Sequence, residues 1–332
     1  MRGLAFFGAV LLLAGPALAD EPPAALAPYV EDGALRAGDY GWARGAFDGA
    51  GPQDKAAYES IVAWRDACFA AARDDMRAEV AALGGVLPDD DIPYGGPQLC
   101  RTAFPPKLEA FPDFAQLEAA SARVTPLFAS YMAAADRAQS ISTANATTLG
   151  EQLLARTLVD QLLRGALVLV WTREPPFAGL SDAEIAVLDA LVRNAVMAQD
   201  LVHTEWLKAH VAEHGWPTVS EAGPRGANAA WLLAQHADLD PAFQLRALQL
   251  MEPQVVAGEA NAANFAALTD RVWLKLSGLQ RYGTQLSCRD GWREALMLED
   301  AAGVDARRAE MGMSPLADYV ATMNARGPCS QG

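Results

Sequence analysis

The sequence has little positive charge for its length. It contains 26 Lys and Arg residues against 41 Asp and Glu, which gives a formal net charge of −15 at pH 7. An acidic surface repels the phosphates of nucleic acids and the headgroups of anionic lipids. The composition therefore disfavours nucleic-acid binding and docking onto anionic membranes.

Several motifs of common enzymes are also missing. There is no Gly-x-Ser-x-Gly elbow for a serine nucleophile, no His-Glu-x-x-His zinc pattern and no Cys-x-x-Cys pair. Alternating strand patterns are scarce, and no internal repeat of solenoid period is present. The scarcity of strand patterns favours an all-α fold. The missing motifs leave any catalytic nucleophile unidentified.

Residues 1–19 have the pattern of a cleavable export signal. Arg2 precedes an apolar run over residues 4–13, and Ala17 and Ala19 form a small-x-small site. An uncleaved membrane anchor is the alternative, but a spanning helix needs about 20 apolar residues. We therefore expect cleavage after Ala19 and a signal peptide that directs the protein to the periplasm or the medium.

One other apolar stretch, residues 158–171, could be mistaken for a membrane segment. It contains Asp160, Gln161 and Arg164 and is too short to span a bilayer comfortably. It is better interpreted as a buried core helix. We expect no membrane association after signal cleavage.

The four cysteines predict disulfides rather than a metal site. An even count in an oxidising compartment favours two bonds, although four cysteines allow three pairings. We favour Cys68–Cys100 and Cys288–Cys329, because each pair flanks a Pro- or Gly-containing stretch and stays within one half of the chain.

Helical spacing of apolar residues dominates the remainder of the chain. The predicted architecture is a multi-helix bundle of long N-terminal helices plus an orthogonal helical C-terminal domain. Helices are expected over residues 54–83, 113–139, 148–171, 181–214, 226–237, 240–258, 261–276 and 315–323. Ser or Thr followed three residues later by Glu predicts capping boxes at Thr148 and Ser181.

The segments between these helices complete the expected domain organisation. Residues 20–53 are rich in Ala, Gly and Pro and are predicted to be a loosely structured lead-in. Six prolines make residues 84–112 an irregular connection, and a brief extended segment is expected near 279–286. The predicted domains are a helical region over residues 54–180 and a C-terminal domain over 181–332.

All four histidines lie between positions 203 and 236. His203, His210 and His214 share one stripe of a predicted helix, and an i, i+4 pair can clamp a metal ion. No carboxylate pattern accompanies them, and a histidine at a helix end is equally explained by the helix dipole. A metal site built from these three is the alternative hypothesis, but we expect no metal and no cofactor.

A series of polar blocks marks the last third of the chain. The blocks are His214-Gly215-Trp216-Pro217, Gln235-His236-Ala237-Asp238, Phe243-Gln244, Thr269-Asp270-Arg271 and Tyr282-Gly283-Thr284-Gln285. In their order they resemble a bacterial family of domains of unknown function, over about residues 196–323. The resemblance implies no reaction. It implies only that His214, His236, Asp270 and Gln285 match pattern positions, whereas His203 stands where the family tends to have Asn.

These blocks yield a hypothesis for a site around His236. A histidine held by a carboxylate can accept and donate protons near neutral pH. Asp238 is a poor partner because residues at i and i+2 of a helix point in different directions, so Asp270 is expected to orient the ring. The predicted substrate-binding residues are Gln235, Arg271, Tyr282, Thr284, Gln285, His214 and Trp216.

Three interpretations of these blocks stay open. One is an exported, metal-independent hydrolase or transferase acting on a small molecule or peptide. Another is a non-catalytic interaction module that binds a partner protein of the cell envelope. The third is that the polar residues form a buried network that only fixes how the helices pack.

Overall fold

The structure is a computed structural model, and it describes residues 21–89, 92, 94–327 and 329. The predicted export signal and its cleavage site lie outside the described residues. Two small two-stranded sheets are the extended elements in the described part, and helices make up most of it. The predicted all-α, multi-helix fold is confirmed.

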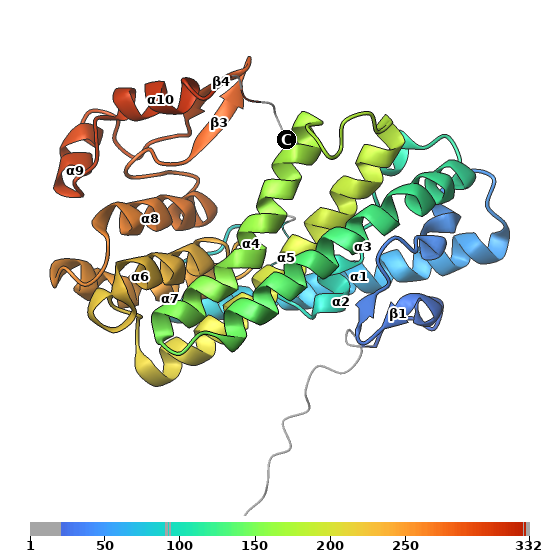
Figure 1. Cartoon of the computed structure of the whole chain (residues 1–332), viewed down its shortest axis with the longest axis horizontal. Coiled ribbons are helices and arrows are strands. Elements are labelled where there is room, and N and C mark those ends of the chain that lie inside the picture. The colour runs from blue at the N-terminus through green and yellow to red at the C-terminus, as the bar shows by residue number, and fades with distance from the viewer. Residues whose placement is uncertain (1–20, 90–91, 93, 328, 330–332) are drawn as a thin grey trace, which may run out of the picture.

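Four long helices form the body of the molecule. They are α1 (Pro52–Ala82), α3 (Phe114–Ala144), α4 (Leu149–Thr172) and α5 (Asp182–His214). Helices α3, α4 and α5 pack against one another and run side by side across Figure 1. The predicted boundaries of these helices agree with the structure to within two residues, except that α3 continues five residues beyond its predicted end at 139.

Both predicted capping boxes are present. Thr148 Oγ1 accepts a hydrogen bond from the backbone N–H of Glu151, whose carboxylate accepts one in return from Thr148 N at 3.0 Å. Ser181 and Glu184 form the same reciprocal pair at the start of α5. Such boxes satisfy amides that would otherwise lack a partner in the first helical turn, so they define where the helix begins.

Three shorter helices follow α5. They are α6 (Val219–Gln235), α7 (Pro241–Val256) and α8 (Ala262–Ser277). Helix α6 packs against α4 and α5, and α8 packs against α6 and α7. Helix α6 begins seven residues before the predicted start at 226, because Thr218 forms a third capping box with Glu221. Gly223, at φ +70°, then interrupts the helix just before Pro224, which explains why the sequence pattern predicted only the later part.

The C-terminal segment folds over α8. It contains β3 (Leu286–Arg289), β4 (Trp292–Ala295), α9 (Val304–Glu310) and α10 (Leu316–Asn324), with β3 and β4 antiparallel. In Figure 1 these elements form a separate layer beyond α8. The expected extended segment over 279–286 ends where β3 starts, and neither β4 nor α9 was predicted.

The predicted lead-in is packed rather than loose in its described part, residues 21–53. Its elements are short, namely η1 (Ala27–Tyr29), β1 (Val30–Glu31), β2 (Ala34–Leu35) and η2 (Gly41–Ala46). Nevertheless Leu26 is 0% exposed and Trp42 is 4% exposed, and both belong to the core between the long helices. Apolar burial, not regular structure, holds this segment in place.

Two hydrophobic cores share the helices α4 and α5. Leu163 and Leu188 belong to the first core, with α3, whereas Leu153 and Leu207 belong to the second, with α6, α7 and α8. The two cores are therefore joined through the same pair of helices. The domain boundary predicted at residue 180 stays a prediction.

The irregular connection after α1 holds α2 (Gln98–Thr102) and η3 (Leu108–Ala110). Both predicted disulfides are present: Cys68–Cys100 joins α1 to α2, and Cys288–Cys329 joins β3 to the segment after α10. No helix in the described residues has the length and apolar character needed to cross a membrane.

Candidate acid–base site

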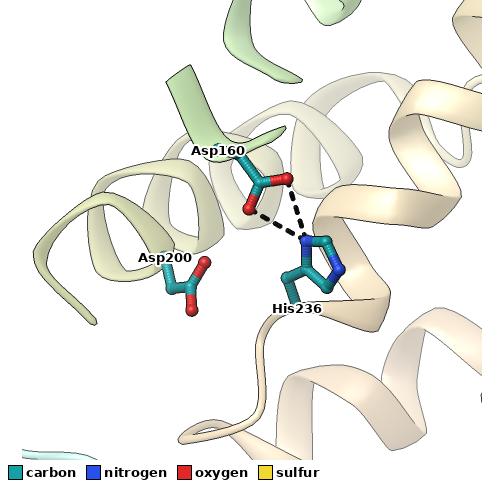
Figure 2. A group of neighbouring side chains, drawn as sticks. All are labelled: Asp160, Asp200 and His236. Carbon is teal, nitrogen blue, oxygen red and sulfur yellow. Dashed lines mark hydrogen bonds and ion pairs between the residues drawn. The ribbon is translucent and has the colours of Figure 1, made fainter. Parts of the chain in front are cut away.

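Three ionisable side chains from separate helices lie close together in the fold. Asp160 lies on α4, Asp200 lies on α5 and His236 caps the C-terminal end of α6 (Figure 2). One side-chain oxygen or nitrogen of each lies within 4.8 Å of those of the others. These residues are far apart in the sequence, so tertiary packing creates the site.

A glycine contact between α4 and α6 brings Asp160 and His236 together. A Cβ added at Gly226 would lie 2.6 Å from Gly150 Cα, and one at Gly150 would lie 2.1 Å from the carbonyl oxygen of Ala222. The two helices can therefore approach more closely than helices with side chains at these positions. Asp160 lies ten residues after Gly150 on α4, and His236 lies ten residues after Gly226 on α6. Because the two helices run in the same direction and rise equally per residue, both side chains reach the same level along them.

The imidazole of His236 is held by a fully engaged carboxylate. Its Nδ1 lies 2.9 Å from Oδ1 and 3.0 Å from Oδ2 of Asp160. Arg164 Nε donates to Oδ1 at 2.9 Å, and Gln161 Nε2 donates to Oδ2 at 2.7 Å. Since each carboxylate oxygen has two partners, the position and orientation of the ring are tightly constrained.

Asp160 is an anion despite being only 2% exposed. Burial alone would raise its pKa, but the hydrogen bond and charge of His236, together with Arg164, outweigh that effect and lower the pKa of Asp160 to about 2. An ionised carboxylate only accepts hydrogen bonds, so Nδ1 of His236 carries the proton. In the neutral ring the lone pair is therefore on Nε2.

Solvent reaches this free nitrogen. Nε2 of His236 has no hydrogen-bond partner among the described residues, yet it is not one of their buried, unpartnered polar atoms. The side chain as a whole is 14% exposed. An oriented imidazole with an accessible Nε2 has the geometry of a general base.

Asp200 supplies a second ionisable group beside the ring. Arg164 Nη2 donates to both of its oxygens, at 2.7 and 2.8 Å. Burial raises the pKa of Asp200 to about 7 against the charge of Arg164, and the negative charges of Asp160 and Asp238 add to the increase. Two neighbouring carboxyl groups thus differ in pKa, which is an arrangement typical of acid–base sites.

The same three residues have the spacing of a metal site. Two carboxylates and an imidazole can bind a divalent cation, and this is the one such group in the described part of the chain. However, Arg164 donates to both carboxylates, and Nδ1 of His236 is engaged with Asp160. A guanidinium already supplies positive charge between the carboxylates, so the geometry favours an acid–base role over metal binding.

The hypothesis of a three-histidine metal site is wrong. His203 is 2% exposed and neither ring nitrogen has a hydrogen-bond partner in the described residues. His214 has a 56% exposed side chain at the end of α5, where its ring centroid lies 5.0 Å from that of His210. The stripe passes from the interior to the surface, so its members do not converge on one ion.

The predicted pairing of His236 with Asp270 is also wrong. Asp270 is 0% exposed and accepts hydrogen bonds from the backbone N–H groups of Arg281, Tyr282 and Thr284 at 2.7–2.8 Å. A fourth bond comes from the Thr284 hydroxyl at 2.8 Å. Asp270 therefore anchors the Tyr-Gly-Thr-Gln turn. Asp160, not Asp270, is the carboxylate that orients the His236 ring.

Arg271 and Gln235 lie in a polar cluster that influences the site. Arg271 and Lys275 both donate to Asp238, at 2.5 Å each, and Lys275 also donates to Gln244 Oε1 at 2.6 Å. Burial would raise the pKa of Asp238, but these two cations lower it overall. Gln235 is 6% exposed, and its backbone carbonyl accepts a bond from Gln244.

The other predicted substrate-binding residues lie elsewhere. Thr284 and Gln285 line a cavity between the end of α4 and α10, and His236 is not among the residues that line it. Tyr282 is buried, and its carbonyl accepts a hydrogen bond from Arg308 at 2.7 Å. Trp216 packs into the second core, and His214 lies at the exposed end of α5. The polar blocks thus do not form one continuous site.

Asp160, Arg164 and Asp200 were not among the site residues predicted from the sequence. A signal was available, because Asp160 and Arg164 interrupt an apolar stretch at i, i+4 spacing. Charged residues inside a core helix need partners, and they often mark a functional site. No local feature, however, indicates which distant residue provides the partner.

The buried ring of His203 predicts an acid-sensitive fold. Burial lowers the pKa of His203 from 6.5 to about 4, so the unfolded chain binds this proton more readily than the folded protein. The associated stability is fully present above pH 6.5 and is lost as the pH falls towards 4, at about 1.4 kcal/mol per pH unit. We expect urea denaturation at a series of pH values to show this loss.

The variant His203→Asn should remove this component of the acid sensitivity. The matched control His214→Asn changes an exposed histidine and should keep the wild-type pH profile. Equal losses of stability in wild type and His203→Asn between pH 6.5 and 4 would contradict the prediction.

Comparison with known proteins yields a family but no activity. A family model described as a family of unknown function (DUF6624) matches residues 148–327. The match begins at the start of α4, well before the predicted start of the family region at residue 196, and it contains Asp160, Asp200 and His236. No curated protein and no solved structure matches the chain.

Proposed function

We propose that this chain, which belongs to the family of unknown function DUF6624, is a metal-independent hydrolase or transferase. The proposed substrate is a small molecule or peptide, and the proposed catalytic residues are His236 and Asp160. The observation that carries the proposal is the imidazole held through Nδ1 by a buried carboxylate while Nε2 faces solvent.

The proposed chemistry is proton transfer at Nε2. His236 Nε2 removes a proton from water or a substrate hydroxyl as that oxygen attacks an electrophilic centre. The imidazolium that forms is stabilised by the adjacent charge of Asp160. It then returns the proton to the leaving group, so the ring ends as it began. Asp200 is a second proton donor, since a pKa of about 7 leaves part of it protonated at neutral pH.

Of the predicted substrate-binding residues, Arg271 and Gln235 stay in the proposal. Gln235 directly precedes His236 in the chain, and Arg271 donates a hydrogen bond to Asp238, two residues after His236. The Arg271 side chain is 29% exposed. The charge of Asp238 acts on Asp200, which connects this cluster to the catalytic group. Thr284, Gln285, Tyr282, His214 and Trp216 are left out because they lie elsewhere.

We further propose that the protein acts in the periplasm or is secreted. Two disulfides support an oxidising compartment, since cytosolic thiols are usually kept reduced. The pattern of residues 1–19 supports export by the same argument as above.

The test is a panel of chromogenic p-nitrophenyl esters, amides, phosphates and glycosides. The wild type is expected to hydrolyse at least one of them, and His236→Gln should lower kcat by about 10²–10⁴, the usual range for losing a general acid or base. The control His214→Gln alters an exposed histidine and should keep wild-type activity. Activity should also survive treatment with a chelator.

A second measurement does not depend on the substrate. Nitrogen-15 NMR of the histidine rings should find Nδ1 of His236 protonated and Nε2 unprotonated in the neutral ring, with that preference lost in Asp160→Asn. The opposite tautomer in the wild type, or full activity of His236→Gln, would overturn the proposal.

A non-catalytic interaction module remains the alternative. It predicts a His236 ring sealed by packing, whereas the side chain is 14% exposed and Nε2 is accessible. The partial exposure of the ring favours the acid–base proposal. Recovery of one stoichiometric envelope protein in a pull-down, together with no turnover of any panel substrate, would favour the alternative.

A further inference from the structure

A second cavity lies among α6, α7 and α8, and it has a composition unlike that of the acid–base site. Its volume is about 390 Å³, within the range of small-molecule pockets. Its polar and aromatic lining residues are Trp216, Asn228, Trp231, Asn261 and Asn264. It shares no residue with the Asp160, Asp200 and His236 cluster.

The lining of this cavity carries no charge. None of the residues that form it is Asp, Glu, Lys, Arg or His, although 20% of the chain is charged. An ionised ligand would lose hydration there without gaining a counter-ion. The cavity is therefore suited to a neutral ligand.

Its asparagines present a donor and an acceptor side by side. Asn264 Nδ2 donates to Asn228 Oδ1 at 2.9 Å, which leaves Asn264 Oδ1 and Asn228 Nδ2 without further partners in the described residues. Exchanging oxygen and nitrogen in both amides would leave the same complementary pair. Asn261 uses its Oδ1 to cap α8, so its Nδ2 is a further donor.

The two tryptophans add apolar surface to this polar rim. Trp231 is half-buried on α6, and Trp216, at 4% exposure, lies deeper. A hydroxyl group both donates and accepts, so neighbouring hydroxyls match neighbouring amides, while indole packs against apolar C–H groups. We propose that this cavity binds a neutral saccharide through these amides and indoles.

The test uses the indole N–H signals of the intact protein in ¹⁵N NMR spectra. Glucose, galactose, N-acetylglucosamine, maltose and cellobiose are titrated separately, and the Trp231 signal is assigned with Trp231→Phe. At least one of these sugars is expected to shift the Trp231 signal in a saturable manner. The double variant Asn228→Ala/Asn264→Ala should weaken that binding by about tenfold or more, as expected for losing two hydrogen bonds.

Two controls separate this site from its alternatives. Asn145→Ala changes an exposed asparagine at the end of α3 and should bind like the wild type, and so should His236→Gln, whose substitution lies in the other site. Three outcomes would overturn the proposal: no shift with any sugar, unchanged binding by the double variant, or tighter binding of glucose 6-phosphate than of glucose.

Discussion

Replacing Asp160 with alanine is expected to lower the free energy of unfolding by about 3–5 kcal/mol at pH 7. Asp160 is 2% exposed and accepts hydrogen bonds from Arg164, Gln161 and His236. Removing its carboxylate leaves these donors unsatisfied at the α4–α6 contact, although Arg164 keeps its bonds to Asp200. Urea denaturation monitored by circular dichroism measures the change.

The pH dependence of this contribution follows from the depressed pKa of Asp160. The unfolded group has a pKa of 3.8 and the folded one about 2, so the stabilisation is present above 3.8 and is lost as the pH falls towards 2. The matched control is Asp182→Ala, which removes an 85% exposed partner of Arg173 and should cost about 1 kcal/mol or less. Equal costs for Asp160→Ala and Asp182→Ala would contradict the prediction.

Replacing Asp270 with alanine is expected to lower stability by a similar 3–5 kcal/mol, for a different reason. Asp270 accepts three backbone N–H groups and one hydroxyl of the turn that leads into β3. Without it, these donors lose their partner at a site that is 0% exposed. The loss should be concentrated in the C-terminal layer, because the turn joins that layer to α8.

Hydrogen exchange locates this effect. Amides over residues 281–298 should exchange on the order of 10²-fold faster in Asp270→Ala, while α3 and α4 keep their protection. The control Asp305→Ala removes a single exposed bond to Leu316 N and should change exchange only locally. Activity per folded molecule should be retained in Asp270→Ala, and a loss as large as that of His236→Gln would restore Asp270 to a catalytic role.

The shared use of α4 and α5 explains how a buried carboxylate can be tolerated. Asp160 lies between Leu153 in the second core and Leu163 in the first, at a point where α6 ends and its capping histidine reaches α4. The end of α6 places the His236 imidazole beside Asp160, between two apolar cores. A charge at such a position is stable only with complementary partners, which Arg164, Gln161 and His236 supply.

How much of the site the sequence predicts depends on the range of the interaction. His236 was predicted as a site residue from a polar block, and the caps predicted at Thr148 and Ser181 were confirmed, because these features involve residues within a few positions of one another. Asp270 was assigned to the ring because Asp238, in the block of His236 itself, lies at i+2 and points in another direction, so a carboxylate from a different segment was expected. Its actual partners, residues 281–284, also lie close in sequence, but backbone N–H groups leave no signature in side-chain identity.

The long helices and their caps therefore follow from the order of residues alone, since helical periodicity, capping and chain stops act over a few positions. The disulfide pairing was favoured from the sequence, but only the fold selected it among the three possible pairings. Folding decided which carboxylate reaches the imidazole. Asp160 and His236 are 76 residues apart, and they meet because Gly150 and Gly226 allow α4 and α6 to approach closely and run in parallel. A contact of that kind depends on how two surfaces fit, which no single stretch of sequence specifies.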